Sequence, residues 1–381
     1  MVGDNNHIIY FDHAATTSPN QEVVSLYTEV STKYFANSSS AHKLGLDNAR
    51  LLKKAREDIL RSLKAPNHQV IFTSGATEAN NLALKGYMER YSNRGKHLII
   101  SSIEHPSILN TANHLAKLGY DVTILPVRGD GKVHLEDLKK EIREDTILVS
   151  IMAVNNETGI IQPIDEIAKF IKQFPTIAFH VDAVQGVGKI EIPYQDIDLV
   201  TISMHKIGGL KGSGILLKKK NIELSPLLDG GGQEEGYRSG TNDLSLAVTT
   251  AVALKEAVSN IGSKKAYISS IVEPLFKYFE DHKDEVVINS TRENPFTINI
   301  SLLKKKASVF AEFLSNNNIM ISTHSACSSK LDIGSPTLTA MGKNAVITKN
   351  AMRLSFAPTN TKEEIDRFIE VFDFGLKGIR G

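Results

Sequence analysis

The stretch HLIISSIEHPSILNTANHLAKLGYDVTILP, residues 97–126, contains one complete strand–helix–strand unit. It opens with the apolar, β-branched run His97–Ser101 and closes with a second such run at Val122–Pro126. Between them, Pro106–Lys117 repeats its apolar residues at helical spacing. Two buried strands joined by an amphipathic helix are typical of parallel neighbours in an α/β sheet.

The same alternation extends on both sides of this unit. Apolar runs predict five further strands, at Val70–Thr73, Ile147–Ile151, Ile177–Val181, Leu199–Ile202 and Gly214–Leu217. Amphipathic stretches between many of them predict helices at Glu78–Arg90, His134–Arg143 and Ile164–Gln173. The sequence therefore predicts a large α/β domain around a mostly parallel, seven-stranded sheet.

The pattern changes near residue 244. Long helices are expected first, then two short strands and two more helices, in the order Leu244–Ser259, Lys265–His282, Val286–Asn289, Phe296–Ile300, Ala307–Asn316 and Lys362–Leu376. This mixture predicts a smaller α+β domain. We place the large domain at residues 12–255 and assign residues 1–11 and 256–381 to the small domain.

The composition excludes several classes of protein. The chain has 381 residues, 41% of them hydrophobic, and a formal net charge of +1, which argues against disorder and against a nucleic-acid footprint. No apolar run approaches the roughly 20 residues that span a bilayer. The N-terminal residues lack a basic segment followed by an apolar one. With a single cysteine, Cys327, the chain forms no intrachain disulfide or multi-cysteine metal site. We expect a cytoplasmic protein without membrane contact.

Ligands of an open parallel sheet bind beyond the carboxyl ends of its strands. Thr73-Ser74-Gly75-Ala76-Thr77 follows one strand and opens a helix, so it is either a phosphate-binding turn or an ordinary helix cap. Asp182 follows another strand, where a carboxylate begins a turn or faces a ligand nitrogen. Lys206 lies in Ser203–Gly209, a small-residue loop that is a poor setting for a mere surface lysine and would let a desolvated amine reach a ligand.

Two further strand ends carry polar residues. His105 precedes a helix, and Asn155-Asn156-Glu157-Thr158-Gly159 follows the strand Ile147–Ile151. Each of them alone is explained by a turn or a helix start. Together with the other strand ends, they gather phosphate donors, a carboxylate, an amine, an imidazole and an amide, a mixture that chance turns would not favour.

Cys327 lies in the polar run Ser322–Lys330. Free cysteines are most often buried as small hydrophobic residues. Here the neighbours are Ser, Thr, His and Lys, and an exposed thiol near cationic groups can be partly ionised and reactive. We therefore interpret Cys327 as a functional residue.

From about Ile9 to Asp366 the chain resembles the pyridoxal-phosphate-dependent cysteine desulfurases of the iron–sulfur-cluster and nitrogen-fixation type, in the class V aminotransferase family. The segments that carry the resemblance are Tyr10–Thr17, Asn37–His42, Phe72–Asn81, Glu104–His105, Asn155–Gly159, His180–Gln185, Ser203–Lys206, Gly230–Glu234, Arg238–Thr241, Ser325–Ser328 and Arg353–Ser355. No single segment is specific, but their common order is.

The resemblance implies a fold-type-I, pyridoxal-phosphate-dependent transferase that forms a homodimer. It implies that L-cysteine is converted to L-alanine, with a persulfide left on Cys327. The sulfur would then pass to an acceptor protein, either an iron–sulfur cluster scaffold or a tRNA- or thiamin-thiolation protein.

The resemblance also assigns roles to individual residues. Cys327, Lys206 and His105 would be catalytic, with Lys206 bonded to the cofactor and His105 stacked on its ring. Asp182 would pair with the pyridinium nitrogen. Arg353 would bind the substrate carboxylate, with Asn155 beside it. The remaining cofactor-binding positions are Gln185 and Asn155 at the phenolic oxygen, Thr77, Ser203 and His205 at the phosphate, Ala76 next to Thr77, and Thr241 from the other subunit. No metal is implied.

The sequence departs from the family pattern in places. Ser38 replaces a proline that commonly follows the asparagine, and Thr323-His324-Ser325 replaces a glycine-containing stretch before the cysteine. Two other readings stay open: a selenocysteine lyase or another aminotransferase-type enzyme in which Cys327 carries no sulfur, and a catalytically idle scaffold. The scaffold should have lost Lys206, Asp182 or Cys327, and all three are present.

Overall fold

In the computed structural model, residues 7–323 and 334–378 are described. The central sheet has seven strands in the order β2-β8-β7-β6-β5-β3-β4. Their bounds are β2 His68–Thr73, β3 His97–Ser101, β4 Asp121–Leu125, β5 Thr146–Ser150, β6 Ala178–Asp182, β7 Leu199–Ser203 and β8 Gly214–Lys219. Only β8 runs against its neighbours β2 and β7. The prediction of a mostly parallel seven-stranded sheet is confirmed.

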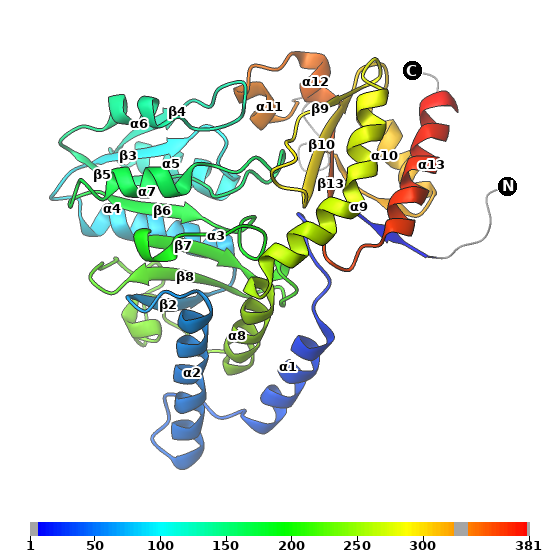
Figure 1. Ribbon diagram of the computed structural model, residues 1–381. Coiled ribbons are helices and arrows are strands. Elements are labelled where there is room, and N and C mark those ends of the chain that lie inside the picture. Colours follow the sequence, from blue (N-terminus) through cyan, green and yellow to red (C-terminus); the bar gives the residue numbers. More distant parts are fainter. Residues whose placement is uncertain (1–6, 324–333, 379–381) are drawn as a thin grey trace.

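Helices cover both faces of this sheet (Figure 1). Alternate residues of β3 show why both faces are apolar: Ile99 belongs to one core, whereas Leu98 and Ile100 belong to the other. The first core is closed by α2 Lys43–Ser62, α7 Ile164–Ile171 and α8 Leu244–Val258. The second is closed by α5 Pro106–Lys117 and by the helical segment that starts with α3. Side chains alternate across a strand, so a strand buried on both faces reads as a continuous apolar run.

That helical segment differs from the prediction of one regular helix at Glu78–Arg90. It consists of α3 Ala76–Asn81, a π-helical turn at Leu82–Gly86, and α4 Tyr87–Arg90. In the turn, an added Cβ on Gly86 would lie 2.7 Å from the carbonyl oxygen of Ser225. The close approach of the 225 backbone therefore requires glycine there. Sequence periodicity does not record such a contact.

Besides two short helices near the C-terminus, at Pro336–Ala340 and Ala345–Lys349, two long helices were not expected from the sequence. They are α1 Gln21–Lys33 and α2, and both pack on α8 beyond the edge strand β2 (Figure 1). The other elements of the large domain are α6 Leu135–Glu141 and short 3₁₀ turns at Tyr194–Asp196, Met204–Lys206 and Glu234–Gly236.

The second part of the chain forms its own antiparallel sheet, in the order β12-β13-β10-β9. Its strands are β9 Val286–Ile288, β10 Thr297–Leu302, β12 Ser322–Thr323 and β13 Ala351–Ser355. The helices α9 Ile261–Asp281, α10 Ala307–Asn316 and α13 Lys362–Gly378 cover it around a core rich in phenylalanine (Figure 1). The N-terminal strand β1 Ile9–Tyr10 joins this part by pairing with β11 Ile319–Met320.

We propose that the chain divides at residues 255 and 256, with residues 1–11 in the small domain. Support comes from Ile9 and Phe11, whose side chains are buried in the phenylalanine-rich core of the small domain. The segment with α11 Pro336–Ala340 and α12 Ala345–Lys349 is different, because Leu338 and Ile347 pack into the core of the large domain. This segment therefore links the two domains.

Among the described helices, none alone is long and apolar enough to cross a membrane. The two helices α8 and α9 reach the required length and composition only as a pair, across a bend of 63°.

Candidate functional site

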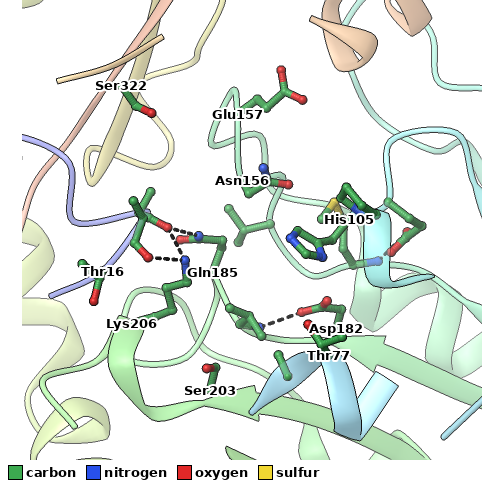
Figure 2. Close-up of a pocket in the computed structure, with 18 of the residues that line it drawn as sticks. Thr16, Thr77, His105, Asn156, Glu157, Asp182, Gln185, Ser203, Lys206 and Ser322 are labelled. Atoms are coloured by element: carbon green, nitrogen blue, oxygen red, sulfur yellow. Dashed lines mark hydrogen bonds between the residues drawn. The ribbon is translucent and has the colours of Figure 1, made fainter. Parts of the chain in front are cut away.

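A cavity of about 850 Å³ opens at the carboxyl ends of the central strands (Figure 2). Its walls are the segments that follow β2, β3, β5, β6 and β7, with residues 14–16 on one side. The small domain closes it with Asn299, Ser322 and Arg353, among others. The site predicted from polar residues at strand ends therefore exists, and it lies between the two domains.

Lys206 ends the short turn after β7 and points into this cavity (Figure 2). Its Nζ donates to the carbonyl oxygens of Ala14 and Ala15, both at 2.6 Å. Burial, followed by the positive charge of Arg353, lowers the pKa of the Lys206 ammonium to about 8. More of this amine is neutral near pH 7 than in an exposed lysine, which suits a nucleophile.

Asp182 ends β6 and is buried at the floor of the cavity. Its Oδ2 accepts a hydrogen bond from Nδ2 of Asn80 at 2.8 Å, and its Oδ1 accepts from the backbone N–H of Val184 at 3.0 Å. These two donors fix the direction of the carboxylate. It is therefore a preorganised acceptor for a protonated ligand nitrogen.

His105 is the N-terminal cap of α5, and its ring lines the cavity. Its Nδ1 accepts the backbone N–H of Ser107 at 3.1 Å, so a neutral ring carries its proton on Nε2. Burial lowers the pKa of His105; Asp182 opposes this effect and Lys206 adds to it. The neutral, fixed imidazole is suited to stack on a flat ligand ring.

The part of the cavity next to the start of α3 is suited to bind an anion. Ala76 and Thr77 form the first turn of α3, whose unpaired N–H groups face outward from the helix start. Ser203 and His205 lie beside them, with Oγ and Nδ1 2.9 Å apart. Burial, then the charges of Lys206 and Lys211, lower the pKa of His205 to about 4, so its ring is neutral at pH 7.

Gln185 and Arg353 line the same cavity as Lys206. The Gln185 amide Nε2 donates to the carbonyl of Ala14 at 2.9 Å. Arg353 lies on β13, and its Nη2 donates to Oδ1 of Asp12 at 2.8 Å while its Nη1 donates to the carbonyl of Asn156 at 2.9 Å. Its Nε is buried without a partner among the described residues. A carboxylate bound in the cavity would satisfy that N–H.

Asn155 is not among the residues that line the cavity, and its contact with a ligand stays a prediction. Its Oδ1 instead accepts from the backbone N–H groups of Glu157 and Thr158, at 3.0 and 2.9 Å, and its Nδ2 donates to the carbonyl of Ile103. These bonds shape the turn after β5. The next residue, Asn156, does line the cavity.

One other predicted residue, Thr241, is not among the residues that line this cavity. It is exposed on the loop before α8. Cys327 and His324 lie outside the described residues. The chain that follows at 334 is anchored through Glu157, whose carboxylate accepts hydrogen bonds from the hydroxyls of Ser335 and Thr337 at 2.5 and 3.1 Å.

Several residues at the site were missed from the sequence. Glu104 adjoins His105 in the same motif and is buried beneath the cavity, with Oε1 accepting from Ser101 and from the backbone of Met152. Asp12 lies in the N-terminal motif and forms an ion pair with Arg353. The residues around Asp12 do not indicate this distant partner. The side chain of Lys189 donates a hydrogen bond to Gln185, and no pattern in the surrounding sequence indicates this contact.

The residues fit pyridoxal phosphate by their chemistry. The cavity holds an amine of lowered pKa, a fixed carboxylate, a neutral imidazole, and a helix start flanked by hydroxyl groups. The unpartnered Nε of Arg353 adds a donor for a carboxylate. Lys206, Asp182 and His105 would hold the ring of the cofactor, and the start of α3 with Ser203 and His205 would hold its phosphate.

Comparisons with known proteins agree with this fit. Residues 9–368 match the aminotransferase class-V family. A "NifS/IcsS protein homolog" from Lactobacillus delbrueckii subsp. bulgaricus is 40% identical over 371 residues, which cover 96% of this chain and 96% of that protein. A "Cysteine desulfurase IscS" from Dictyoglomus turgidum is 35% identical over 376 residues, 98% of this chain and 95% of the relative.

A solved structure described as a "NIFS-LIKE PROTEIN" superimposes with a TM-score of 0.91 at 33% identity. The match covers 98% of this chain and 100% of that one. The arrangement of both domains is therefore shared with that protein over their whole length.

Proposed function

This chain belongs to the aminotransferase class-V family and is a pyridoxal-phosphate-dependent cysteine desulfurase, and we propose that the cavity described above is its active site. The observation that carries the proposal is the convergence of Lys206, Asp182, His105 and Arg353 on one cavity. The names of the relatives favour cysteine desulfuration over the selenocysteine-lyase alternative.

Bound pyridoxal phosphate supplies an electron-accepting ring for the negative charge that develops on the substrate α-carbon. Asp182 holds the ring nitrogen protonated, because its carboxylate is fixed by Asn80 and the backbone of Val184. His105 would lie against the ring as a neutral imidazole that carries its proton on Nε2. Gln185 would donate its amide N–H to the phenolic oxygen.

Lys206 has two tasks in this proposal. Its amine would hold the cofactor covalently, and the lowered pKa of about 8 makes the neutral form accessible. With cysteine bound, the amine of Lys206 would accept the α-proton and return a proton to the carbon. Arg353 holds the substrate carboxylate through Nε and the remaining N–H groups of its guanidinium.

The sulfur-transfer step falls to Cys327. Its thiolate attacks the sulfur of bound L-cysteine, so that an S–S bond forms and the C–S bond breaks. The electron pair of the C–S bond stays on carbon and, with a proton, gives L-alanine. The persulfide on Cys327 then passes to an acceptor protein, a scaffold for iron–sulfur clusters or a thiolation protein.

The experiment combines product analysis with one variant. Purified protein is incubated with cysteine, and alanine, sulfide and the mass of the Cys327 peptide are measured. We expect alanine together with a peptide heavier by one sulfur atom. Cys327→Ser should still bind pyridoxal phosphate and cysteine but release little alanine. Alanine formation by Cys327→Ser at the rate of the unmodified protein would refute the persulfide step.

We also propose that the enzyme works as a cytoplasmic homodimer. Support comes from Thr241, which matches a phosphate-binding position of the family but is exposed and does not line the cavity of its own chain. A neighbouring subunit could place this hydroxyl at the phosphate end of the other cavity.

A further inference from the structure

Lys189 is a buried lysine that none of the steps above uses. It lies in the tight turn after β6, four residues beyond Gln185. The backbone N–H groups of Val187 and Lys189 donate to the carbonyls of Ala183 and Gly186, both at 3.0 Å. Gly188 takes a left-handed φ of 74°, and a Cβ there would lie 2.9 Å from the carbonyl oxygen of Ala257. This turn places the Lys189 side chain against the side chain of Gln185.

The contacts of Lys189 are unusual for a buried cation. It is 9% exposed, and its Nζ donates to Oε1 of Gln185 at 2.9 Å. No carboxylate in the described parts of the chain lies within ion-pair distance of it. Burial, followed by the charges of Lys206 and Arg353, lowers its pKa to about 7. An uncompensated lysine is costly to bury, so a role at the neighbouring site is a reasonable explanation.

The orientation of Gln185 follows from this contact. A side-chain amide has an oxygen and an NH₂ group of nearly the same shape, so its environment decides which faces where. The Nζ of Lys189 donates to the oxygen of Gln185, and in the ammonium form, which Lys189 takes below its pKa of about 7, it can only donate. The amide N–H of Gln185 then faces the cavity, where it donates to the carbonyl of Ala14 at 2.9 Å.

We propose that Lys189 is a positioning residue, which holds the Gln185 amide with its N–H toward the phenolic oxygen of the cofactor. The inference rests on the proposed function, because it takes Gln185 as the residue at that oxygen. Without Lys189 the amide can turn over and present its own oxygen instead. The phenolic oxygen would then lose the amide N–H donor and would face the amide oxygen of Gln185, which repels it.

The test follows the absorbance of the bound cofactor as a function of pH. An N–H donor at the phenolic oxygen favours its deprotonated form, so loss of the donor should raise the pH of the titration midpoint in Lys189→Met. Loss of a hydrogen bond to a charged group costs about 1.5–3 kcal/mol, equivalent to roughly 1–2 pH units at 1.36 kcal/mol per unit. The matched control is Lys218→Met, since Lys218 is also buried, at 1% exposed, but donates to the carbonyl of Ile222 and does not line the cavity.

The double variant Lys189→Met/Gln185→Ala separates positioning from a direct effect of charge. If Lys189 acts through Gln185, its removal adds no further shift once Gln185 is alanine. If the two shifts add, the ammonium acts on the cofactor by its charge alone, and the inference is wrong. An unchanged midpoint in Lys189→Met also overturns it.

Other outcomes remain interpretable. If Lys189→Met does not fold, Lys189→Gln carries the same test, because an amide can accept as well as donate and no longer dictates the orientation of Gln185. Failure of the unmodified protein to bind pyridoxal phosphate would refute the proposed function. A shift in Gln185→Ala without one in Lys189→Met or Lys189→Gln would refute the role of Lys189 alone.

Discussion

Replacement of Arg353 by lysine tests how the enzyme recognises its substrate. The guanidinium is largely buried, at 14% side-chain exposure, and uses Nη2 for Asp12 and Nη1 for the carbonyl of Asn156. These two contacts leave Nε and the remaining N–H groups for a carboxylate. Lysine keeps the positive charge and can keep one of these partners. Its single nitrogen cannot keep the hydrogen bonds to Asp12 and Asn156 and also form a two-point contact with a ligand.

The expected loss is that of one charge-assisted hydrogen bond. Such a bond contributes about 1.5–3 kcal/mol, and each 1.4 kcal/mol is a factor of ten in affinity. We therefore expect the Michaelis constant for cysteine to rise on the order of tenfold to a hundredfold in Arg353→Lys. The turnover number should change less, because Arg353 holds the substrate and donates no proton in the reaction. Affinity for pyridoxal phosphate should stay the same.

The assay is steady-state alanine formation, with cofactor affinity measured in parallel. Arg292→Lys is the matched control, since this arginine also has two hydrogen-bond partners, the carboxylates of Glu273 and Glu280, but lies on the surface. A Michaelis constant in Arg353→Lys equal to that of the control would show that another residue binds the carboxylate.

Three further predictions concern the cofactor, the protonation of the site and the assembly. Lys206→Ala should lose the covalent link to pyridoxal phosphate, seen as loss of its absorbance band and of borohydride trapping at residue 206; trapping at another lysine would contradict the assignment. Burial raises the pKa of Glu104 to about 8, so the folded apoprotein binds an extra proton and loses stability as pH rises from about 4.5 to 8. Glu104→Gln should remove that loss, a difference on the order of a few kcal/mol between urea titrations at pH 5 and pH 8; parallel pH dependence in both proteins would contradict it. Sedimentation should give a dimer, and Thr241→Ala should weaken phosphate-dependent cofactor binding; an active monomer would exclude a shared site.

Much of the large domain could be predicted from the sequence because its signals are local. Each of the seven central strands is a short apolar run, and the loop after each strand can be identified by position alone. Lys206, Asp182, His105 and Thr77 were therefore found as residues at strand ends, and the structure brings them to one cavity. Their individual roles stay predictions until the variants are measured.

Two features of the large domain were less accessible from the sequence. The helix α1 carries only two buried residues, Val23 and Val30, so it has little apolar periodicity to detect. The sequence could not predict which of Asn155 and Asn156 lines the cavity. The two neighbouring residues are identical and differ only in which one the turn uses for its own hydrogen bonds.

The sequence by itself determined the order of strands and helices, the family, and the polar residues at the strand ends. The tertiary structure alone decided which side chains meet. Lys206 bonds to a carbonyl 192 residues away, and Arg353 pairs with Asp12 across 341 residues. Periodicity is set by neighbours within a few positions, whereas these contacts exist only after both domains have packed and the N-terminal segment has crossed between them. For the same reason, the contact of Lys189 with Gln185 became visible only when the fold showed which way the amide faces.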